Sequence, residues 1–276
     1  MAGWVGLSPA QRRLFVACGA GAGLGAVYNV PLGGALFTAE VLVGSIALPT
    51  ILPTLACSWI ATATAWLYLP TSATYIDIFA FHSDTRLIVW ALLLGPIVGV
   101  FAAGYIRLLG WVSHHRVSGR KALAAPLVAF AVLGVVGLGY PQLFGNGKNM
   151  AHDVFLGGGG LGSLLALFIL KPLVTALCLG SGASGGLFTP VISTGAVLGG
   201  ALGLLWSYAW PGSPVGAYAT IGAAMQAPLA ALALVLELTH SGFQLMVPMM
   251  VATVTATAIT RYLDGYSIYS ARLTAK

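Results

Sequence analysis

The stretch with the most evident chemistry is Gly180–Pro190, which reads GSGASGGLFTP and lies between the apolar runs Leu161–Leu179 and Val191–Leu205. Bare backbone in hydrocarbon leaves peptide groups unpaired, so this break must be buried in protein or line a polar cavity. Glycine allows positive φ and close approach to the backbone. A helix that starts after the break presents N–H groups and the positive end of its dipole. The residue types therefore predict an anion site, with a plain tight turn as the alternative.

Two glutamates occupy related positions in apolar segments. Glu40 follows Pro31-Leu32 at the same spacing as Glu237 follows Pro228-Leu229, and the offset between the two segments is 197 residues. We interpret this as an internal repeat. An ionisable residue in an apolar segment invites a functional hypothesis. The repeat-related placement favours a structural role instead, such as a backbone hydrogen bond or a helix-end contact. Lys171, inside another apolar run, either reaches the membrane surface or adds positive potential near an ion path.

The residues that could bind a metal or catalyse a reaction do not occur at the spacings that a metal site or an active site needs. Cys18, Cys57 and Cys178 stand apart in apolar runs, which is typical of small buried hydrophobic residues. His114 and His115 are adjacent but have no carboxylate or cysteine nearby in sequence, so a solvated loop is favoured over a metal site. There is no nucleophile–base constellation, and the glycine-rich stretch lacks the ending of a nucleotide-binding loop. We expect no catalytic residue, no metal, no cofactor and no enzymatic activity.

Composition indicates a protein whose solvent is the bilayer. Of 276 residues, 58% are hydrophobic and 7% are charged, against about 25% charged in soluble domains. The net charge of +6 does not indicate nucleic acid, because the basic residues fall between apolar segments and form no basic face.

The elements that must position these residues are helices. Ser8 is expected to cap a helix that begins with Pro9, and Val30, which precedes Pro31, marks a boundary before a short helix over Leu32–Val43. Pro70–Arg86 is expected to be an exposed loop, and Tyr140–Gly160 to re-enter or to lie at the surface. The expected spans and shorter apolar runs are Ile46–Leu69, Leu87–Val112 (broken at Gly95-Pro96), Ala122–Leu138, Leu161–Leu179, Val191–Trp210, Val215–Ala224, Leu229–Leu238, Met246–Ile259 and Tyr266–Leu273. Several are shorter than the roughly 20 residues that a crossing helix needs, which is typical of a transporter core with broken helices.

Basic residues indicate one orientation. Most of the basic residues outside the apolar runs can lie on one side of the membrane: Arg12, Arg13, the Arg116–Lys121 cluster, Arg261, Arg272 and Lys276. The positive-inside rule makes that side cytoplasmic. We therefore expect a multi-pass integral membrane protein, in a bacterial cell membrane.

The motifs resemble those of the CLC family of voltage-gated chloride channels and chloride/proton antiporters. Gly185-Gly186-Leu187-Phe188-Thr189-Pro190 resembles the family's GxFxP signature. The segment Tyr28–Glu40 is similar to its "FNAPLAG" helix, and Met225–Thr239 to the counterpart in the second repeat. Ile268-Tyr269-Ser270-Ala271 resembles the terminal segment that supplies a pore tyrosine. The matches lie in order along essentially the whole chain.

This resemblance implies an all-α membrane protein, a homodimer in the lipid bilayer, in which each subunit has two inverted repeats of tilted, partly broken helices around its own chloride path. The backbone N–H groups of Leu187 and Phe188 would bind chloride, with Gly185, Gly186 and Pro190 forming the filter loop. The Tyr269 hydroxyl would close the inner side of the site. Val41 stands where proton-coupled members commonly carry an inner glutamate. Because valine cannot relay protons, the resemblance favours channel-like or uncoupled movement.

The family's first chloride-binding serine motif and its gating glutamate motif do not occur in this sequence. We therefore expect an N-terminally truncated member in which most of the first repeat is missing. Residues 1–45 would be the end of the first repeat, and residues 46–276 would hold the remaining helices, the second repeat and the filter, with no cytoplasmic regulatory domain. Four functions stay open: uncoupled chloride transport, coupled chloride/proton antiport, transport of another anion, and a non-transporting fragment. No nucleic-acid partner is expected.

Overall fold

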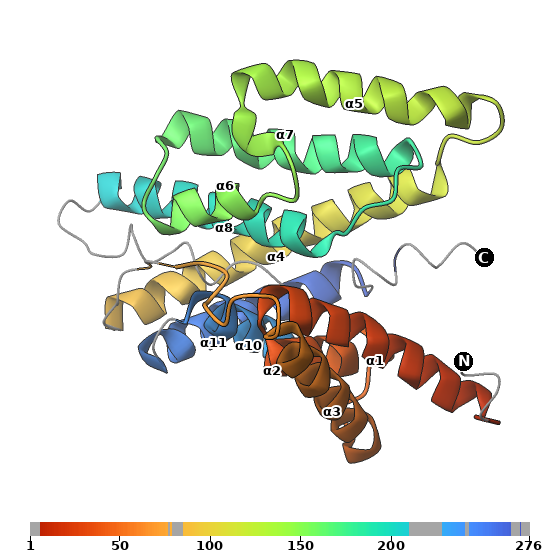
Figure 1. Ribbon diagram of the computed structural model, residues 1–276. Coiled ribbons are helices and arrows are strands. Elements are labelled where there is room, and N and C mark those ends of the chain that lie inside the picture. Colours follow the sequence, from red (N-terminus) through yellow and green to blue (C-terminus); the bar gives the residue numbers. More distant parts are fainter. Residues whose placement is uncertain are drawn as a thin grey trace. The chain divides into compact units, whose positions relative to one another are not determined.

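The structure is a computed structural model that describes residues 6–76, 78, 85–209, 228–240, 243–265 and 271. Within these ranges every regular element is a helix, as the sequence predicts (Figure 1). The chain forms two compact units. The first unit comprises Met1–Phe81 and Ala227–Met246, and the second comprises His82–Gln226 and Val247–Lys276. This division does not test the repeat boundary at residue 45, which stays a prediction.

In the first unit, α3 packs against both α1 and α2, and α10 packs against α2. The side chains at the centre of this contact are small or polar: Gly25 of α1 and Gly34 of α2 leave room for Ser58 of α3, whose hydroxyl would lie within 3 Å of a Cβ at either glycine. Close helix packing over glycine and serine is typical of membrane helices. The elements of this unit are α1 (Pro9–Tyr28), α2 (Pro31–Phe37), the π-helix η1 (Thr38–Val43), α3 (Leu48–Ala65), α10 (Pro228–Thr239) and η3 (Phe243–Leu245).

In the second unit, α7 contacts α5, α4 and α8, and the short helix α6 packs on α8. The cluster of buried side chains in this region includes Leu143, Met150, Leu167 and Val197. The elements are α4 (Thr85–His114), α5 (Lys121–Gly139), η2 (Pro141–Leu143), α6 (Lys148–Phe155), α7 (Leu161–Gly180), α8 (Phe188–Ala209) and α11 (Met246–Leu263).

Six helices in the described ranges are long and apolar enough to cross a membrane, namely α3, α4, α5, α7, α8 and α11. They differ in how much of their surface the protein itself covers: 72% of the residues in the α8 window are buried, against 11% in α5. A helix that is apolar and uncovered in a membrane protein suits lipid contact. The multi-pass membrane topology expected from composition is therefore confirmed.

The helix starts expected from sequence are confirmed at both α1 and α2. The Ser8 hydroxyl accepts from the Gln11 N–H, and the Gln11 side chain accepts from the Ser8 N–H, which completes a capping box ahead of Pro9. α1 ends at Tyr28 and is capped by Asn29, whose φ of 56° is left-handed, and α2 begins two residues after Asn29, at Pro31. The sequence did not indicate that α2 continues as a π-helix over Thr38–Val43.

The break expected at Gly95-Pro96 is wrong, because α4 is continuous from Thr85 to His114. Membrane helices tolerate proline when neighbouring groups satisfy the freed carbonyl. Gly95 has a packing role instead: a Cβ there would collide with the Thr255 hydroxyl and lie 2.9 Å from the Ala252 carbonyl oxygen. The glycine allows α11 to approach α4.

Two loop predictions are correct only in part. The region 140–160 contains η2 and α6, and Leu143, Met150 and Val154 are buried, so it does not lie at the surface throughout, and its re-entry stays a prediction. In the described part of Pro70–Arg86, Tyr75 is buried and its N–H donates to the Leu238 carbonyl at 2.8 Å. The expected run Val215–Ala224 lies outside the described residues.

Candidate functional site

The break between α7 and α8 extends from Ser181 to Leu187. Its first two residues still follow α7, because the N–H groups of Ser181 and Gly182 donate to Leu177 and Leu179. The Ser181 hydroxyl donates to the Cys178 carbonyl at 2.7 Å, which satisfies another acceptor at the helix end. Gly182 then adopts φ of 91°, a conformation that side chains disfavour. The glycine therefore ends α7 and turns the chain.

The first turn of α8 is buried, whereas the glycines before it are exposed. Leu187 and Phe188 are 4% and 7% exposed. A Cβ added at Gly185 or Gly186 would meet no heavy atom within 4 Å. The structure thus places open space beside Gly185 and Gly186, immediately before a buried helix start. The candidate filter residues, Gly185 to Pro190, span this change from exposed glycines to a buried helix start, and their role as a filter stays a prediction.

The N-terminus of α8 carries the positive end of a long helix dipole, and no acidic side chain in the first turn neutralises it. α8 has 22 residues and no acidic residue in its first turn, and the Val191 N–H closes the first helical bond onto Leu187. Its dipole therefore puts positive potential at Phe188.

Lys171 places a buried cation in the same unit. Its ammonium group donates to the carbonyls of Leu143 and Gly145 at 2.9 and 3.0 Å, and its side chain is 2% exposed. A Cβ at Gly147 would meet both the Ser193 side chain and Lys171 Cε, so Lys171 lies beside the second turn of α8. The expectation that Lys171 could reach the membrane surface is therefore wrong. It is bound to backbone carbonyls inside the unit.

The carboxylates of the two glutamates contact helix starts in the first unit, and each glutamate binds the start of the other repeat's helix. The Glu237 carboxylate, on α10, accepts from the N–H groups of Leu32 and Gly33 at the start of α2, at 3.0 and 2.6 Å. The Glu40 carboxylate, on η1, accepts from the Ala230 N–H at the start of α10 at 2.7 Å. Gly33 and Ala230 are related by the same 197-residue offset.

A carboxylate at a helix N-terminus satisfies unpaired donors and opposes the dipole. These are the helix-end contacts that the structural interpretation of Glu40 and Glu237 predicts, and any part in coupling stays a prediction. Gly33 must be small for this arrangement, since a Cβ there would lie 2.8 Å from Leu234 Cγ and 3.0 Å from Glu237 Oε2.

Val41 lies on η1 directly after Glu40 and is partly exposed. Tyr269, the predicted inner ligand, lies outside the described residues. No group of three or more His, Cys, Asp or Glu side chains suited to a metal occurs among the described residues. Cys18 and Cys57, isolated in sequence, are in side-chain contact between α1 and α3.

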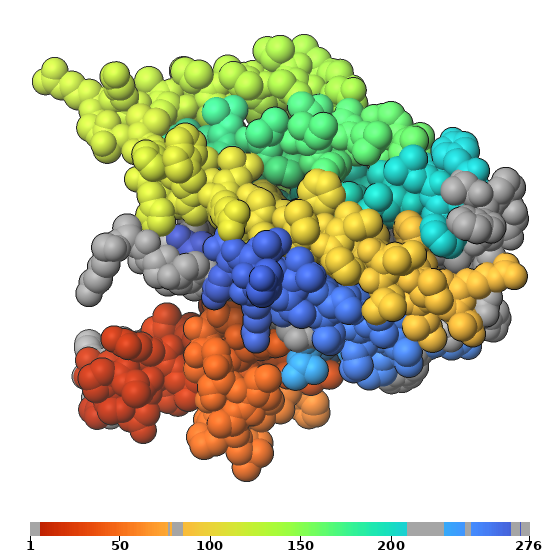
Figure 2. Space-filling view, turned by 180° about the vertical axis from the view of Figure 1, so that it is seen from behind, coloured from red at the N-terminus to blue at the C-terminus, as the bar shows by residue number. Residues whose placement is uncertain are grey.

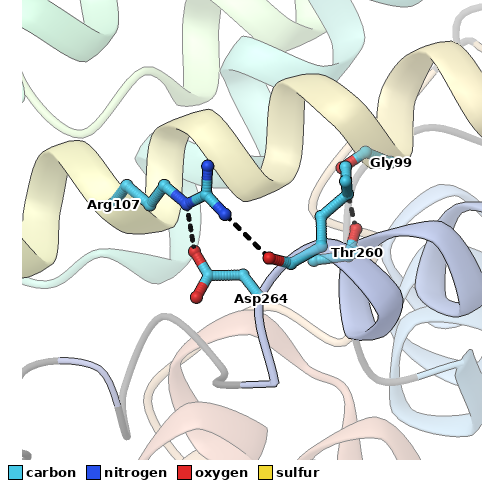
Figure 3. A network of polar contacts seen from close by, with 5 residues as sticks. Gly99, Arg107, Thr260 and Asp264 are labelled. Atoms are coloured by element: carbon cyan, nitrogen blue, oxygen red, sulfur yellow. Dashed lines mark hydrogen bonds and ion pairs between the residues drawn. The ribbon is translucent and has the colours of Figure 1, made fainter.

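Sequence reasoning missed a polar contact in the second unit. Arg107 Nε of α4 pairs with Asp264 Oδ2 at 2.9 Å, and Arg107 Nη2 donates to the Leu263 carbonyl at 2.7 Å (Figure 3). One signal was present: Arg107 is the single charged residue in the expected span Leu87–Val112. An ionisable residue in a membrane segment calls for a named partner.

Comparison with known proteins decides the family. A family model described as "Voltage gated chloride channel" matches residues 1–261. The chain belongs to this family. It is 31% identical over 281 residues to a curated relative named H(+)/Cl(-) exchange transporter ClcA from Yersinia pestis bv. Antiqua (strain Angola), covering 96% of this chain and 59% of the relative.

The fold agrees with solved structures of the family. A slow cyanobacterial Cl-/H+ antiporter matches with a TM-score of 0.84 at 24% identity, over 97% of this chain and 66% of that one. A CLC-type fluoride/proton antiporter matches with a TM-score of 0.73 at 22% identity, over 94% and 65% of the two chains. The CLC-type fold predicted from sequence is therefore confirmed. The chain spans about three fifths of the length of the curated relative, 59%.

Proposed function

We propose that this chain takes part in passive chloride movement across a membrane, with the anion bound at the start of α8. The observation that carries the proposal is the buried first turn of α8 preceded by two exposed glycines with open space beside them. Family membership supports the choice of an inorganic anion, and the helix dipole supplies the attraction.

In this mechanism the backbone N–H groups of Leu187 and Phe188 donate to chloride, and the Tyr269 hydroxyl donates from the inner side. Gly185 and Gly186 leave the approach open because they carry no side chain. The ligands are dipoles and not a cationic side chain in direct contact, so binding is strong enough to admit the ion and weak enough to release it.

Uncoupled movement is our preferred mode because of Val41. Its aliphatic side chain has no titratable proton, and both glutamates of the chain accept hydrogen bonds from helix starts. Coupled exchange is the second candidate, favoured by the names of the relatives: the Yersinia relative is an H(+)/Cl(-) exchange transporter and the cyanobacterial structure a Cl-/H+ antiporter.

Two further functions remain as alternatives. One structural neighbour is a CLC-type fluoride/proton antiporter, which favours a test of other anions in this site. A fragment without a pore of its own is the alternative that follows from the chain's 59% coverage of its relative. As partners we propose the lipid bilayer and a second copy of the chain.

The test is a flux measurement on the purified chain reconstituted in liposomes loaded with chloride, with a chloride electrode and a pH electrode outside. We expect chloride efflux above that of protein-free liposomes, at constant external pH. Proton movement in fixed ratio to chloride would establish coupling and overturn the uncoupled mode. Efflux indistinguishable from protein-free liposomes would support the non-transporting fragment.

Val41→Glu with Val41→Gln as its control separates these modes further. If the missing titratable group is what uncouples transport, only the glutamate variant should gain proton movement, since glutamine has similar size and polarity but does not titrate. Proton movement in neither variant would show that Val41 does not set the mode.

A further inference from the structure

Lys171 of α7 carries a buried positive charge that the mechanism above does not use. Its side chain is 2% exposed, and its ammonium group donates to the Leu143 and Gly145 carbonyls. α7 packs against α8, and Figure 2 shows α7, in green, next to α8, in cyan. A buried charge costs free energy unless opposite charge or hydrogen bonds compensate it, so the surroundings of Lys171 must supply that compensation.

The two carbonyl dipoles compensate this charge only in part. In the part of the second unit that the structure describes, the acidic residues are Asp153, which is exposed, and Asp264, which pairs with Arg107. Neither of these carboxylates forms an ion pair with Lys171. The described residues therefore leave the ammonium group without a counter-charge.

A short chain of contacts connects Lys171 to the first turn of α8. A Cβ added at Gly147 would lie 3.1 Å from Lys171 Cε and 2.9 Å from Ser193 Cβ, so both side chains flank this glycine. The Ser193 hydroxyl, which is buried, donates at 3.1 Å to the carbonyl of Pro190, the third residue of α8. Because Ser193 follows Phe188 by five residues, about 7.5 Å along the helix axis, the charge lies on the order of 10 Å from the first-turn N–H groups.

Two sources of positive potential therefore act on the start of α8. The helix dipole has its positive end at Phe188, and the first turn contains no acidic residue. Lys171 adds a full charge beside the second turn. Like potentials repel, so their proximity destabilises the unit, and an anion bound where α8 begins would relieve this repulsion.

We propose that Lys171 is a remote electrostatic determinant of anion affinity, whose buried ammonium group attracts an anion at the start of α8 without contacting it. The inference rests on the proposed function, and of the proposed ligands it needs only the Leu187 and Phe188 amides. At a separation of about 10 Å and an effective dielectric constant of about 20, Coulomb's law gives an effect of about 15-fold on affinity.

A purely structural role would be to hold the segment 143–147 through hydrogen bonds, and three variants separate that role from the effect of charge. Lys171→Gln removes the charge but retains two N–H donors for the Leu143 and Gly145 carbonyls. Lys171→Met removes both the charge and the donors. Lys171→Arg keeps both. A role through charge groups the glutamine variant with methionine, whereas a role through hydrogen bonds groups it with arginine.

The test is calorimetric titration of chloride into the purified full chain in detergent, with gluconate holding the ionic strength constant. We expect Lys171→Gln and Lys171→Met to weaken chloride affinity about 15-fold. Lys171→Arg should retain an affinity within about twofold of the unmodified chain. If Lys171→Gln binds chloride as tightly as the unmodified chain, the proposal is overturned, whatever the affinity of Lys171→Met.

Melting temperatures give a second, independent measure of the charge. A ligand that binds the native state raises the melting temperature, so chloride should raise that of the unmodified chain more than that of Lys171→Gln. In gluconate alone, Lys171→Gln should melt close to the unmodified chain, because it loses an uncompensated charge and keeps its donors. Lys171→Met should melt lower, because two carbonyls lose their donor. An equal chloride-induced rise in the unmodified chain and in Lys171→Gln would contradict the proposal.

Lys148→Gln is the matched control. Lys148 is the first residue of α6, directly after Gly147, and it is exposed. The same charge is removed, but water and salt screen an exposed charge, so chloride affinity should remain unchanged. An equal loss of affinity in Lys148→Gln and Lys171→Gln would show that the net charge of the region, and not the buried ammonium group, sets affinity, and would overturn the proposal.

The same titrations separate this inference from the proposed function. If the unmodified chain binds no chloride, the proposed site itself is wrong and the inference falls with it. If the unmodified chain binds chloride and Lys171→Gln binds it equally well, only the inference is wrong.

Discussion

Phe188 is the first residue of α8, and the proposed site depends on its backbone more than on its ring. Proline is compatible with the first position of a helix and lacks the N–H. We expect Phe188→Pro to weaken chloride affinity about fivefold beyond Phe188→Ala, which loses the ring but keeps the donor. Titration calorimetry on both variants measures the difference. Equal affinities would exclude the Phe188 amide as a ligand.

The two glutamates permit a comparison within one molecule. Among the described residues, Glu237 accepts two N–H groups and Glu40 accepts one, so Glu237→Gln should destabilise the protein more. A lost charged hydrogen bond costs about 1.5–3 kcal/mol, and the difference should appear as a lower melting temperature of Glu237→Gln in detergent. Unchanged melting temperatures together with altered proton movement would favour the coupling role instead.

At the scale of elements, α5 is the least covered of the six candidate spans, with 11% of its window buried against 17% in α3 and 72% in α8. We expect Phe130→Arg, at mid-helix, to impair membrane insertion by about 2.5–3.5 kcal/mol. Leu123→Arg, in the first turn, should insert normally because arginine near a helix end can extend to the interface. An insertion assay with engineered glycosylation sites on either side of α5 measures both. Equal insertion would indicate that protein or water, and not lipid, covers the middle of α5.

Sequence predicted the helices well because apolar length, proline and capping residues act locally. Ser8, Pro31 and the long apolar runs each lie where the structure begins or continues a helix. The predicted helix break at Gly95-Pro96 is wrong because a glycine can either interrupt a helix or allow another helix to pack closely. Only the partner helix reveals that Gly95 accommodates Thr255. The sequence did not predict the Arg107–Asp264 ion pair for a related reason. The two residues are separated by 157 positions, and no repeat relates them.

The role of the two glutamates could be predicted from the sequence only in part. The 197-residue offset indicated that Glu40 and Glu237 share a role, but it did not reveal that each carboxylate binds the start of the other repeat's helix. At the candidate anion site, the sequence predicted the residues of the α8 start and the structure shows their burial. Open space beside Gly185 and Gly186 follows only from tertiary packing.

At the scale of the whole molecule, the orientation in the membrane is set by basic loops. The loop between α4 and α5 carries Arg116 and Arg120, and α5 begins at Lys121; all three are exposed. In a variant without native cysteines, Ser118→Cys should react with a membrane-impermeant maleimide in inside-out vesicles and not in intact cells. Reaction in intact cells would reverse the orientation.

The central claim is that an anion binds where α8 begins. Crystals of the chain grown in bromide, with data collected at the bromine absorption edge, test this claim most directly. We expect an anomalous peak within hydrogen-bonding distance of the Leu187 and Phe188 amides, and its loss when chloride is added in excess. Bromide peaks elsewhere in the chain, with none at the start of α8, would contradict the claim.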